Sequence, residues 1–316
     1  MRVLVADILR PDPGAPQRGS FVRDQVAALR RAGVEVEHAG FPAGKRNYPL
    51  AVRGLRRLLR AGRYDVVHAH YGLVGWFALL AGARPLVVTF HGTDVRHPVV
   101  GWMSRRLAGR LDLIGAASEA LFEEETGRPG LPRPPGRSAV LPIGVELGRF
   151  GPRPREESRR RLGLDPDGRY LLFPAAPDRP VKRHDRAAEV AERCGAELLT
   201  VGTAEPDAMP DWVNAASAVL VTSENEGFGL AVPEALACDV PVLSTPVGIA
   251  PTLLEGVEGC LCAPFDPAVW SDLAGEHVSA AHPRVDGRAR AEEYSTDRMA
   301  QRLLDAYREV IERAGP

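Results

Sequence analysis

The chain has 316 residues, of which 45% are hydrophobic and 26% are charged, and its formal net charge is -1. This composition predicts a folded, soluble protein, and the length is sufficient for two domains of ordinary size. The near-neutral charge argues against a protein that binds nucleic acid, and the sequence has no motif for RNA or DNA recognition.

The four cysteines do not form a metal-binding pattern, because Cys260 and Cys262 have neither a second pair nor a histidine cluster near them. Alternation along a strand would place these two side chains on one face, which favours a structural role. Free thiols, the lack of a signal peptide and the lack of a long apolar run predict a cytoplasmic protein.

The chain begins with a short apolar run, residues 2–6, which predicts a buried parallel strand. A proline-rich loop over residues 11–19 follows, and then a helix over residues 21–32 with its apolar residues on one face. Ser20 is expected to cap this helix and Gly33 to end it. A strand, a glycine-bearing loop and a helix in this order are typical of the first unit of a Rossmann-like domain.

Residues 50–61 form a basic amphipathic helix, with four arginines opposite an apolar stripe. A helix of this kind can dock on an anionic membrane surface, as a weak peripheral association at the inner face of the membrane. The commoner interpretation is a surface helix with a buried leucine stripe. The lack of an exposed aromatic anchor in this segment favours that second interpretation.

Two predicted strands end in histidines. Residues 65–70 read Asp-Val-Val-His-Ala-His, and the buried run from residue 86 to 90 is followed by His91 and Gly92. The carboxyl ends of parallel strands are where open α/β sheets bind ligands. We interpret His68 as structural and place His70 nearer the crevice, and we expect a role in the site for His91.

Further elements follow from apolar runs and helical periodicity. Strands are predicted over residues 111–115, 139–145, 170–173 and 197–202, and helices over residues 73–81, 156–162, 210–216 and 296–314.

The most informative stretch runs from residue 223 to 238, Ser-Glu-Asn-Glu-Gly-Phe-Gly-Leu-Ala-Val-Pro-Glu-Ala-Leu-Ala-Cys. It lies between two buried strands, residues 218–221 and 240–243, and its second half, residues 232–238, predicts a helix. Gly227 and Gly229 allow the backbone to approach a ligand closely. The helix N-terminus that follows this turn suits a diphosphate.

Two carboxylates, Glu226 and Glu234, flank the glycine turn. A carboxylate beside a phosphate is electrostatically unfavourable, so we expect both to accept hydrogen bonds from hydroxyl groups of a ribose or a sugar ring. One alternative is a dinucleotide-binding loop, but Val232 stands where its third glycine should be, and no acidic residue follows about twenty positions on. The other alternative is a structural turn with solvated carboxylates.

The pattern E-G-F-G-L-A-V-P-E-A-L-A, with seven residues between its two glutamates, resembles the signature of the retaining nucleotide-sugar glycosyltransferases of family 4. Residues 241–251, the strand and loop that follow, extend the resemblance. It implies a GT-B fold, in which two Rossmann-like domains face each other across a cleft. Residues 1–150 would form the acceptor domain and residues 151–295 the donor domain, with the helix over residues 296–314 crossing back to the first.

The first domain also resembles the family in its T-x-H-G-x-D pattern, which ends at Asp94. The family's histidine contacts the transferred sugar, which implies this role for His91. Asp94 would orient that histidine or the acceptor, and His70 is a second candidate on the acceptor side. The family's glycine loop near the donor phosphates corresponds to Gly19. In the loop after residue 141, Ile143 replaces the usual asparagine.

In the second domain the resemblance implies a lysine on the donor diphosphate, and Lys182 fits it. Pro177 occupies the usual place of the accompanying arginine, so we choose Arg179, with Arg183 as the alternative. Glu226 would meet hydroxyls of the transferred sugar, and Glu234 those of the ribose. The turn between them would bind the donor through Gly227, Phe228, Gly229 and Leu230. Residues 202–211 would contact the base.

The resemblance predicts a retaining glycosyltransferase that moves a sugar from a nucleoside-diphosphate sugar to a hydroxyl of a glycan, a glycolipid precursor or a small metabolite. It implies neither a metal nor another cofactor, because basic groups can neutralise the diphosphate. An epimerase or phosphorylase of the same fold is one alternative, and a non-catalytic subunit that binds nucleotide sugars is the other.

Overall fold

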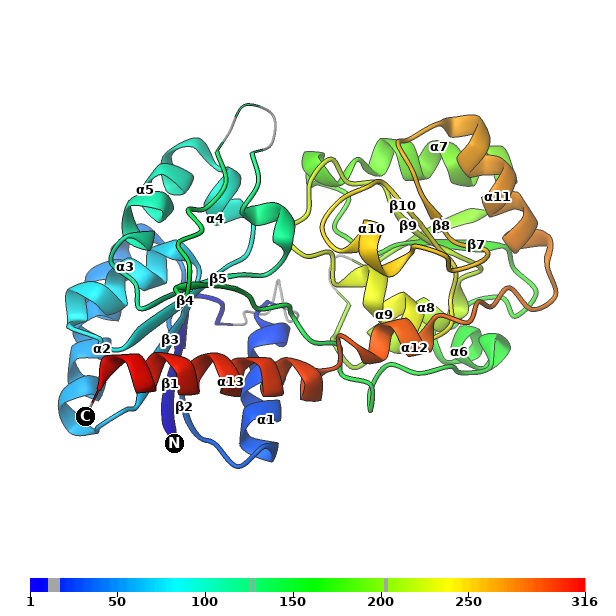
Figure 1. Ribbon diagram of the computed structural model, residues 1–316. Coiled ribbons are helices and arrows are strands. Elements are labelled where there is room, and N and C mark those ends of the chain that lie inside the picture. The colour runs from blue at the N-terminus through cyan, green and yellow to red at the C-terminus, as the bar shows by residue number, and fades with distance from the viewer. Residues whose placement is uncertain (11–17, 125–126, 128, 202–203, 316) are drawn as a thin grey trace. The chain divides into compact units, whose positions relative to one another are not determined.

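The computed structural model describes residues 1–10, 18–124, 127, 129–201 and 204–315, which divide into two compact units (Figure 1). The first unit consists of the described residues of 1–144 together with 296–315, and the second of residues 145–295. The chain therefore changes unit between Gly144 and Val145, whereas the sequence placed the boundary at residue 150. Each unit is an α/β structure and is described by itself.

The first unit contains a six-stranded parallel sheet in the order β2-β1-β3-β4-β5-β6. Its strands are β1 (Arg2–Asp7), β2 (Glu35–Gly40), β3 (Val66–His70), β4 (Leu86–Phe90), β5 (Leu113–Ala116) and β6 (Ser138–Val140). Every residue of β3, β4 and β5 is buried, because helices cover both faces of the sheet. The strand order reverses between β1 and β3, and ligands bind at such a switch point in open α/β sheets.

Helices cover the two faces of this sheet in two groups. The helical segments are α1 (Ser20–Arg31), η1 (Lys45–Asn47), α2 (Tyr48–Ala61), α3 (Gly72–Ala81), α4 (Thr93–Arg96), α5 (Pro98–Ala108), η2 (Glu119–Leu121) and α13 (Thr296–Ala314). One face is covered by α1 and α13, and the other by α2, α3 and α5, which pack side by side (Figure 1). Among the described residues, no helix is both long enough and apolar enough to cross a membrane.

The start of α1 differs from the sequence prediction by one residue. Ser20 is the first helical residue, and Gly19 is the N-cap, with φ of 68°. A Cβ at residue 19 would lie 2.7 Å from the carbonyl oxygen of Leu9, so only glycine fits this turn. The expectation that the Ser20 side chain caps the helix is wrong, because the chain already turns at the glycine. Gly33 ends the helix with φ of 83°, as predicted.

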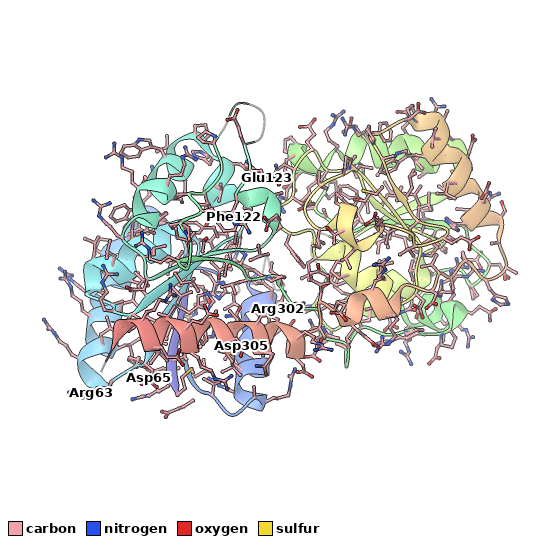
Figure 2. The ribbon with its side chains drawn as sticks, in the orientation of Figure 1. Arg63, Asp65, Phe122, Glu123, Arg302 and Asp305 are labelled. Carbon is pink, nitrogen blue, oxygen red and sulfur yellow. The ribbon has the colours of Figure 1, made fainter. Side chains whose placement is uncertain are left out.

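The C-terminal helix α13 belongs to the core of the first unit. Met299, Leu303 and Tyr307 are buried in one cluster with Val3 of β1 and Val22 of α1. Charged side chains of α13, among them Arg302 and Asp305, alternate with this apolar stripe (Figure 2). The return of the chain end to the first unit, which the resemblance implied, is therefore confirmed.

The second unit contains a five-stranded parallel sheet in the order β11-β10-β9-β7-β8. Its strands are β7 (Tyr170–Phe173), β8 (Glu197–Thr200), β9 (Val219–Val221), β10 (Val242–Ser244) and β11 (Leu261–Cys262). The strand order reverses between β7 and β9, which gives this unit a switch point of its own. Because β11 begins at Leu261, Cys260 precedes it and the expected alternation of two cysteines along one strand is wrong.

Two groups of helices also cover this sheet. The helical segments are α6 (Arg155–Arg161), η3 (Pro180–Lys182), α7 (His184–Cys194), α8 (Met209–Ala215), α9 (Ala231–Ala237), α10 (Ala250–Leu253), α11 (Pro267–Ser279) and α12 (Arg288–Glu292). One face is covered by α7 and α11, where Trp270 is fully buried. Helices α8, α9 and α12 lie on the other face (Figure 1). The loops after β7 and β9 meet at the switch point, and they carry Lys182 and Glu226.

Candidate active site

The predicted site residues fall into two groups, one in each unit. His70, His91, Asp94 and Gly19 belong to the first unit, and the remaining site residues from Arg179 to Glu234 belong to the second. Both groups lie at or after the carboxyl ends of parallel strands. The strand pattern predicted this placement for His70 and His91, and the resemblance implied it for the other residues.

In the first unit, His70 and His91 are in direct contact. His70 is the last residue of β3, and His91 directly follows β4, which pairs with β3 in parallel. The two rings stack with centroids 5.2 Å apart, and His70 Nδ1 lies 2.9 Å from His91 Nε2. The structure therefore joins two histidines that are 21 residues apart in the sequence.

Burial keeps these histidines neutral. Burial lowers the pKa of His91 to about 3 and lowers the pKa of His70 well below its usual value, with a smaller contribution from neighbouring histidines. His68, on the same strand as His70, has its pKa lowered to about 3 by burial. Its ring bonds the Tyr307 hydroxyl at 2.6 Å and the Thr89 hydroxyl at 2.8 Å, in agreement with a structural role.

Asp94 holds two backbone segments together. Its carboxylate accepts hydrogen bonds from the backbone N–H of His91 and from that of Gly72, each at 2.9 Å. Burial raises the pKa of Asp94 to about 6, although the backbone hydrogen bonds oppose this shift. The side chain thus joins the loop after β4 to the start of α3 and fixes the backbone that carries His91.

Two residues that the sequence analysis did not single out, Phe21 and Tyr71, surround His91. The rings of Phe21 and Tyr71 lie 4.9 and 4.7 Å from the imidazole, centroid to centroid. Tyr71 has φ of 72° and ψ of 143°, a conformation that non-glycine residues rarely adopt, and Gly92 has φ of 107°. Backbone strain on both sides of one histidine is typical of a functional site.

His91 also presents a polar atom that the protein leaves unused. Its Nδ1 is buried, and none of the described residues hydrogen-bonds to it. A buried polar atom normally has a partner. His91 can therefore bind a polar group of a substrate.

In the second unit, Lys182 and Glu226 form an ion pair. The Lys182 Nζ lies 2.5 Å from Glu226 Oε1, and both side chains are largely buried, with 15% and 14% of their surfaces exposed. The Ser223 hydroxyl donates to the same carboxylate oxygen at 2.7 Å. The switch point thus holds an ammonium group, which can bind a phosphate, beside a carboxylate, which can accept hydrogen bonds from hydroxyl groups.

The turn after Glu226 is packed tightly against the loop that follows β10. Phe228 is buried, and its carbonyl accepts a hydrogen bond from the backbone N–H of Ile249 at 2.7 Å. Gly248 has φ of 57°, and a Cβ there would lie 2.2 Å from the Phe228 oxygen. Gly229 has φ of 88°, which satisfies the expectation of an unusual backbone conformation at this turn.

The two candidate arginines differ in their surroundings. Arg183 bonds the carboxylates of Asp185 and Glu224, each at 2.7 Å, so two acidic groups already occupy its guanidinium. Arg179 is exposed just before η3. This difference favours Arg179 as the cation available for a ligand.

The remaining donor-side residues lie around α9. Leu230 is the N-cap of this helix, and Glu234 lies in its first turn, half-buried. Gly227 precedes Phe228 in the same turn. Of the segment expected to contact the base, residues 202 and 203 lie outside the described residues. Among the residues that the structure covers, no group of three or more potential ligands is placed to hold a metal ion.

Solved structures with the same fold are glycosyltransferases. Sucrose-phosphate synthase from Thermosynechococcus elongatus is similar with a TM-score of 0.72 and 17% identity, over 99% of this chain and 100% of that one. HepE from Anabaena, solved in complex with UDP-glucose, has a TM-score of 0.68 and 17% identity, over 99% of each chain. Two parallel-sheet α/β units with these neighbours define a GT-B fold, as expected from the sequence.

Sequence comparisons identify the family. The family models Glycosyltransferase Family 4 and Glycosyl transferases group 1 match residues 7–149 and 175–277. A D-inositol 3-phosphate glycosyltransferase from Thermobispora bispora is 30% identical, over 88% of this chain and 78% of that protein. One from Actinosynnema mirum is 32% identical, over 78% and 72%. The chain belongs to glycosyltransferase family 4 and is a glycosyltransferase.

The buried histidines should make the protein less stable in acid. The unfolded chain protonates His68 near pH 6.5, whereas the folded chain does so only near pH 3, so lowering the pH across this window favours unfolding. The loss is about 2 kcal/mol for one such histidine at pH 5. Asp94 acts in the opposite direction below about pH 6, but one carboxyl opposes three histidines. Urea unfolding at pH 7, 6 and 5 measures the net effect.

A pair of variants assigns the effect to the buried cluster. His68→Gln should reduce the slope of stability against pH, whatever it does to stability at pH 7. His282→Gln, at an exposed position of the second unit, should leave the slope unchanged. Stability that is constant or rises from pH 7 to pH 5 would contradict the assignment of neutral histidines.

Proposed function

We propose that the enzyme transfers a sugar from a nucleoside-diphosphate sugar to an acceptor hydroxyl with retention of anomeric configuration. The observation that carries the proposal is the ion pair of Lys182 and Glu226 at the switch point of the second unit. HepE, which shares the fold, was solved with UDP-glucose, a donor of this class. The donor therefore belongs to the second unit, where a cation and a carboxylate stand side by side.

Donor binding exchanges the partners of this pair. In the free enzyme Glu226 neutralises Lys182 at 2.5 Å. A diphosphate beside η3 offers the ammonium group a stronger anionic partner, and the carboxylate is released to accept hydrogen bonds from sugar hydroxyls. Cations at the diphosphate stabilise the charge that develops as the nucleotide leaves, so no metal is needed in this proposal.

The roles of the other residues follow from this arrangement. Arg179 supplies a second cation to the diphosphate, and Glu234 accepts hydrogen bonds from the ribose. The backbone from Gly227 to Leu230 binds the donor, with Gly229 in a conformation that glycine adopts without steric cost. His91 meets the transferred sugar from the first unit, with His70 on the acceptor side and Gly19 beside the phosphates. Asp94 acts through the backbone of His91.

The acceptor is proposed as a small polar molecule with a free hydroxyl. The two relatives described above are named for D-inositol 3-phosphate. This compound and other phosphorylated or free polyols are therefore the first acceptors to test, each with a panel of nucleoside-diphosphate sugars.

Lys182→Ala should weaken binding of a nucleoside diphosphate about 10- to 100-fold, because a charge-assisted hydrogen bond contributes about 1.5–3 kcal/mol. Turnover should fall further, since the leaving group loses its cation. Titration calorimetry with UDP, GDP and ADP measures binding. Lys45→Ala, which changes the other lysine of the chain at an exposed position of η1, is the control. Unchanged affinity and turnover for Lys182→Ala would transfer the role to Arg179.

An α-linked donor should give an α-linked product. An inverting enzyme needs a general base opposite the leaving group, whereas a retaining enzyme of this type lets the departing phosphate take the acceptor proton on the same face. Asp94 is bonded to two backbone N–H groups, and Glu226 is proposed to bond hydroxyls of the transferred sugar, so neither stands as that base. Proton NMR of the anomeric signal decides the outcome. A β-linked product would contradict retention.

We also propose a weak peripheral association of the first unit with anionic membranes. Arg53, Arg56, Arg57 and Arg60 line one surface hollow of about 510 Å³ on α2. The sequence offered no exposed aromatic anchor over residues 50–61, but Trp102 on α5 is 53% exposed, and both helices pack against α3. Leu50, at the start of α2, is 59% exposed.

Co-sedimentation with vesicles tests this association. Binding should be seen with vesicles rich in phosphatidylserine, should be weaker with pure phosphatidylcholine, and should decrease in Trp102→Ser. Val269→Ser, at an exposed apolar residue of the second unit, should bind like the unchanged protein. Equal sedimentation with and without anionic lipid would exclude the association.

A further inference from the structure

A single buried amide connects the histidines of the first unit. Gln25 lies on α1, one turn after Phe21, and is 5% exposed. Its Nε2 lies 3.1 Å from His70 Nε2 and 3.3 Å from His68 Nδ1. His70 continues the series through its Nδ1, 2.9 Å from His91 Nε2. Gln25, His70 and His91 thus form one hydrogen-bonded chain that ends at the unused Nδ1 of His91.

Because the amide nitrogen of Gln25 faces both rings, the direction of every hydrogen bond in the chain follows from it. A neutral imidazole carries one N–H and one lone pair, and an amide NH₂ group can only donate. His70 therefore accepts from Gln25 at Nε2, carries its proton on Nδ1, and donates to His91 Nε2. His91 must then carry its own proton on Nδ1. The unused atom of His91 is a hydrogen-bond donor.

The neighbouring residues agree with this direction. The Tyr307 hydroxyl, 2.6 Å from His68 Nδ1, can donate to it alongside the Gln25 amide. His68 then carries its proton on Nε2 and donates to the Thr89 hydroxyl. The Gln25 NH₂ group faces a lone pair on each ring, and at His68 Nδ1 it shares that lone pair with the Tyr307 hydroxyl, which is the closer of the two donors.

We propose that Gln25 is a positioning residue that holds His91 in the Nδ1–H tautomer, so that this N–H donates to an oxygen of the substrate. Gln25 does not touch the substrate, because His70 stands between it and His91. The inference rests on the proposed role of His91. It adds that the amide on α1 decides which nitrogen of His91 carries the proton.

The orientation of one amide sets the polarity of the whole chain. A hydrogen-bond acceptor in place of the Gln25 NH₂ group would bind a proton on His70 Nε2. The direction of the hydrogen bond between His70 and His91 would then reverse. His91 would carry its proton on Nε2 and present a lone pair at Nδ1. Gln25→Glu places an acceptor at this position, and Gln25→Met removes the donor while keeping a side chain of similar length.

Nitrogen NMR of the free protein tests the tautomers without any assay of activity. The full chain is labelled with ¹⁵N-histidine, and the rings are assigned with His70→Gln and His91→Gln. Long-range proton–nitrogen spectra at pH 7.5 should show the proton on Nδ1 of His70 and His91 and on Nε2 of His68. A proton on Nε2 of His91 in the unchanged protein would overturn the inference. Gln25→Glu should move the His91 proton to Nε2.

Kinetics then connects the tautomer to catalysis. Gln25→Met and Gln25→Glu should lower kcat at least tenfold and change the donor KM by less than twofold, because the amide acts through His91. Ala27→Gln, on the exposed side of α1, should leave both constants unchanged. Urea unfolding shows whether each variant remains folded at the assay temperature.

The two possible failures are distinguishable. If His91→Gln retains full turnover, the proposed role of His91 is wrong, and the catalytic part of this inference fails with it. If His91→Gln abolishes turnover while the Gln25 variants keep both the tautomer and kcat, the role of His91 stands and that of Gln25 is overturned.

Discussion

The hydrogen bond between His70 and His91 joins the carboxyl ends of two central strands. The arrangement of the residues around the candidate site of the first unit depends on this bond. Both rings are neutral, because burial makes a charged imidazole costly. Neutral rings can form a hydrogen-bonded series only if each group in turn donates and accepts. This requirement applies to every group of the series, which runs from β4 through β3 to α1 and, through His68, to α13.

The switch point of the second unit differs from that of the first unit in its electrostatics. It holds opposite charges, Lys182 and Glu226, in place of neutral rings. Two buried charges are tolerated because they neutralise each other, and Ser223 adds a hydrogen bond to the carboxylate. Parallel sheets of similar topology thus present two kinds of chemistry. One unit offers uncharged donors, and the other offers an ion pair that an anionic ligand can exchange.

Much of the fold could be predicted from the sequence, because apolar runs and glycine turns are local signals. The helix over residues 296–314 and the strands that end in His70 and before His91 appear where the periodicity put them. The pattern around Gly227 and Gly229 also identified the family, through its resemblance to the family's signature. The N-cap of α1 could not be predicted, since the contact between Gly19 and Leu9 is not visible in the sequence.

The partners of the site residues were less predictable, because they come from distant parts of the chain. Gln25 and Tyr307 both reach His68, although 282 residues separate them by their numbering. In the sequence, a buried glutamine on a helix looks like an ordinary polar residue, because the sheet on which the helix packs is not known. The sequence analysis singled out Asp94 but not the partners of its carboxylate. These partners are backbone N–H groups, which no pattern of side chains indicates.

The discontinuous first unit has a consequence for the order in which the chain folds during synthesis. Its core includes Met299, Leu303 and Tyr307, so this core is incomplete until α13 leaves the ribosome. The second unit is continuous over residues 145–295 and emerges entirely before that helix. Domains usually fold in the order of their synthesis, beginning at the N-terminus. Here the later-made unit can reach its native structure first, while the apolar face that α13 covers stays exposed until that helix has been synthesised.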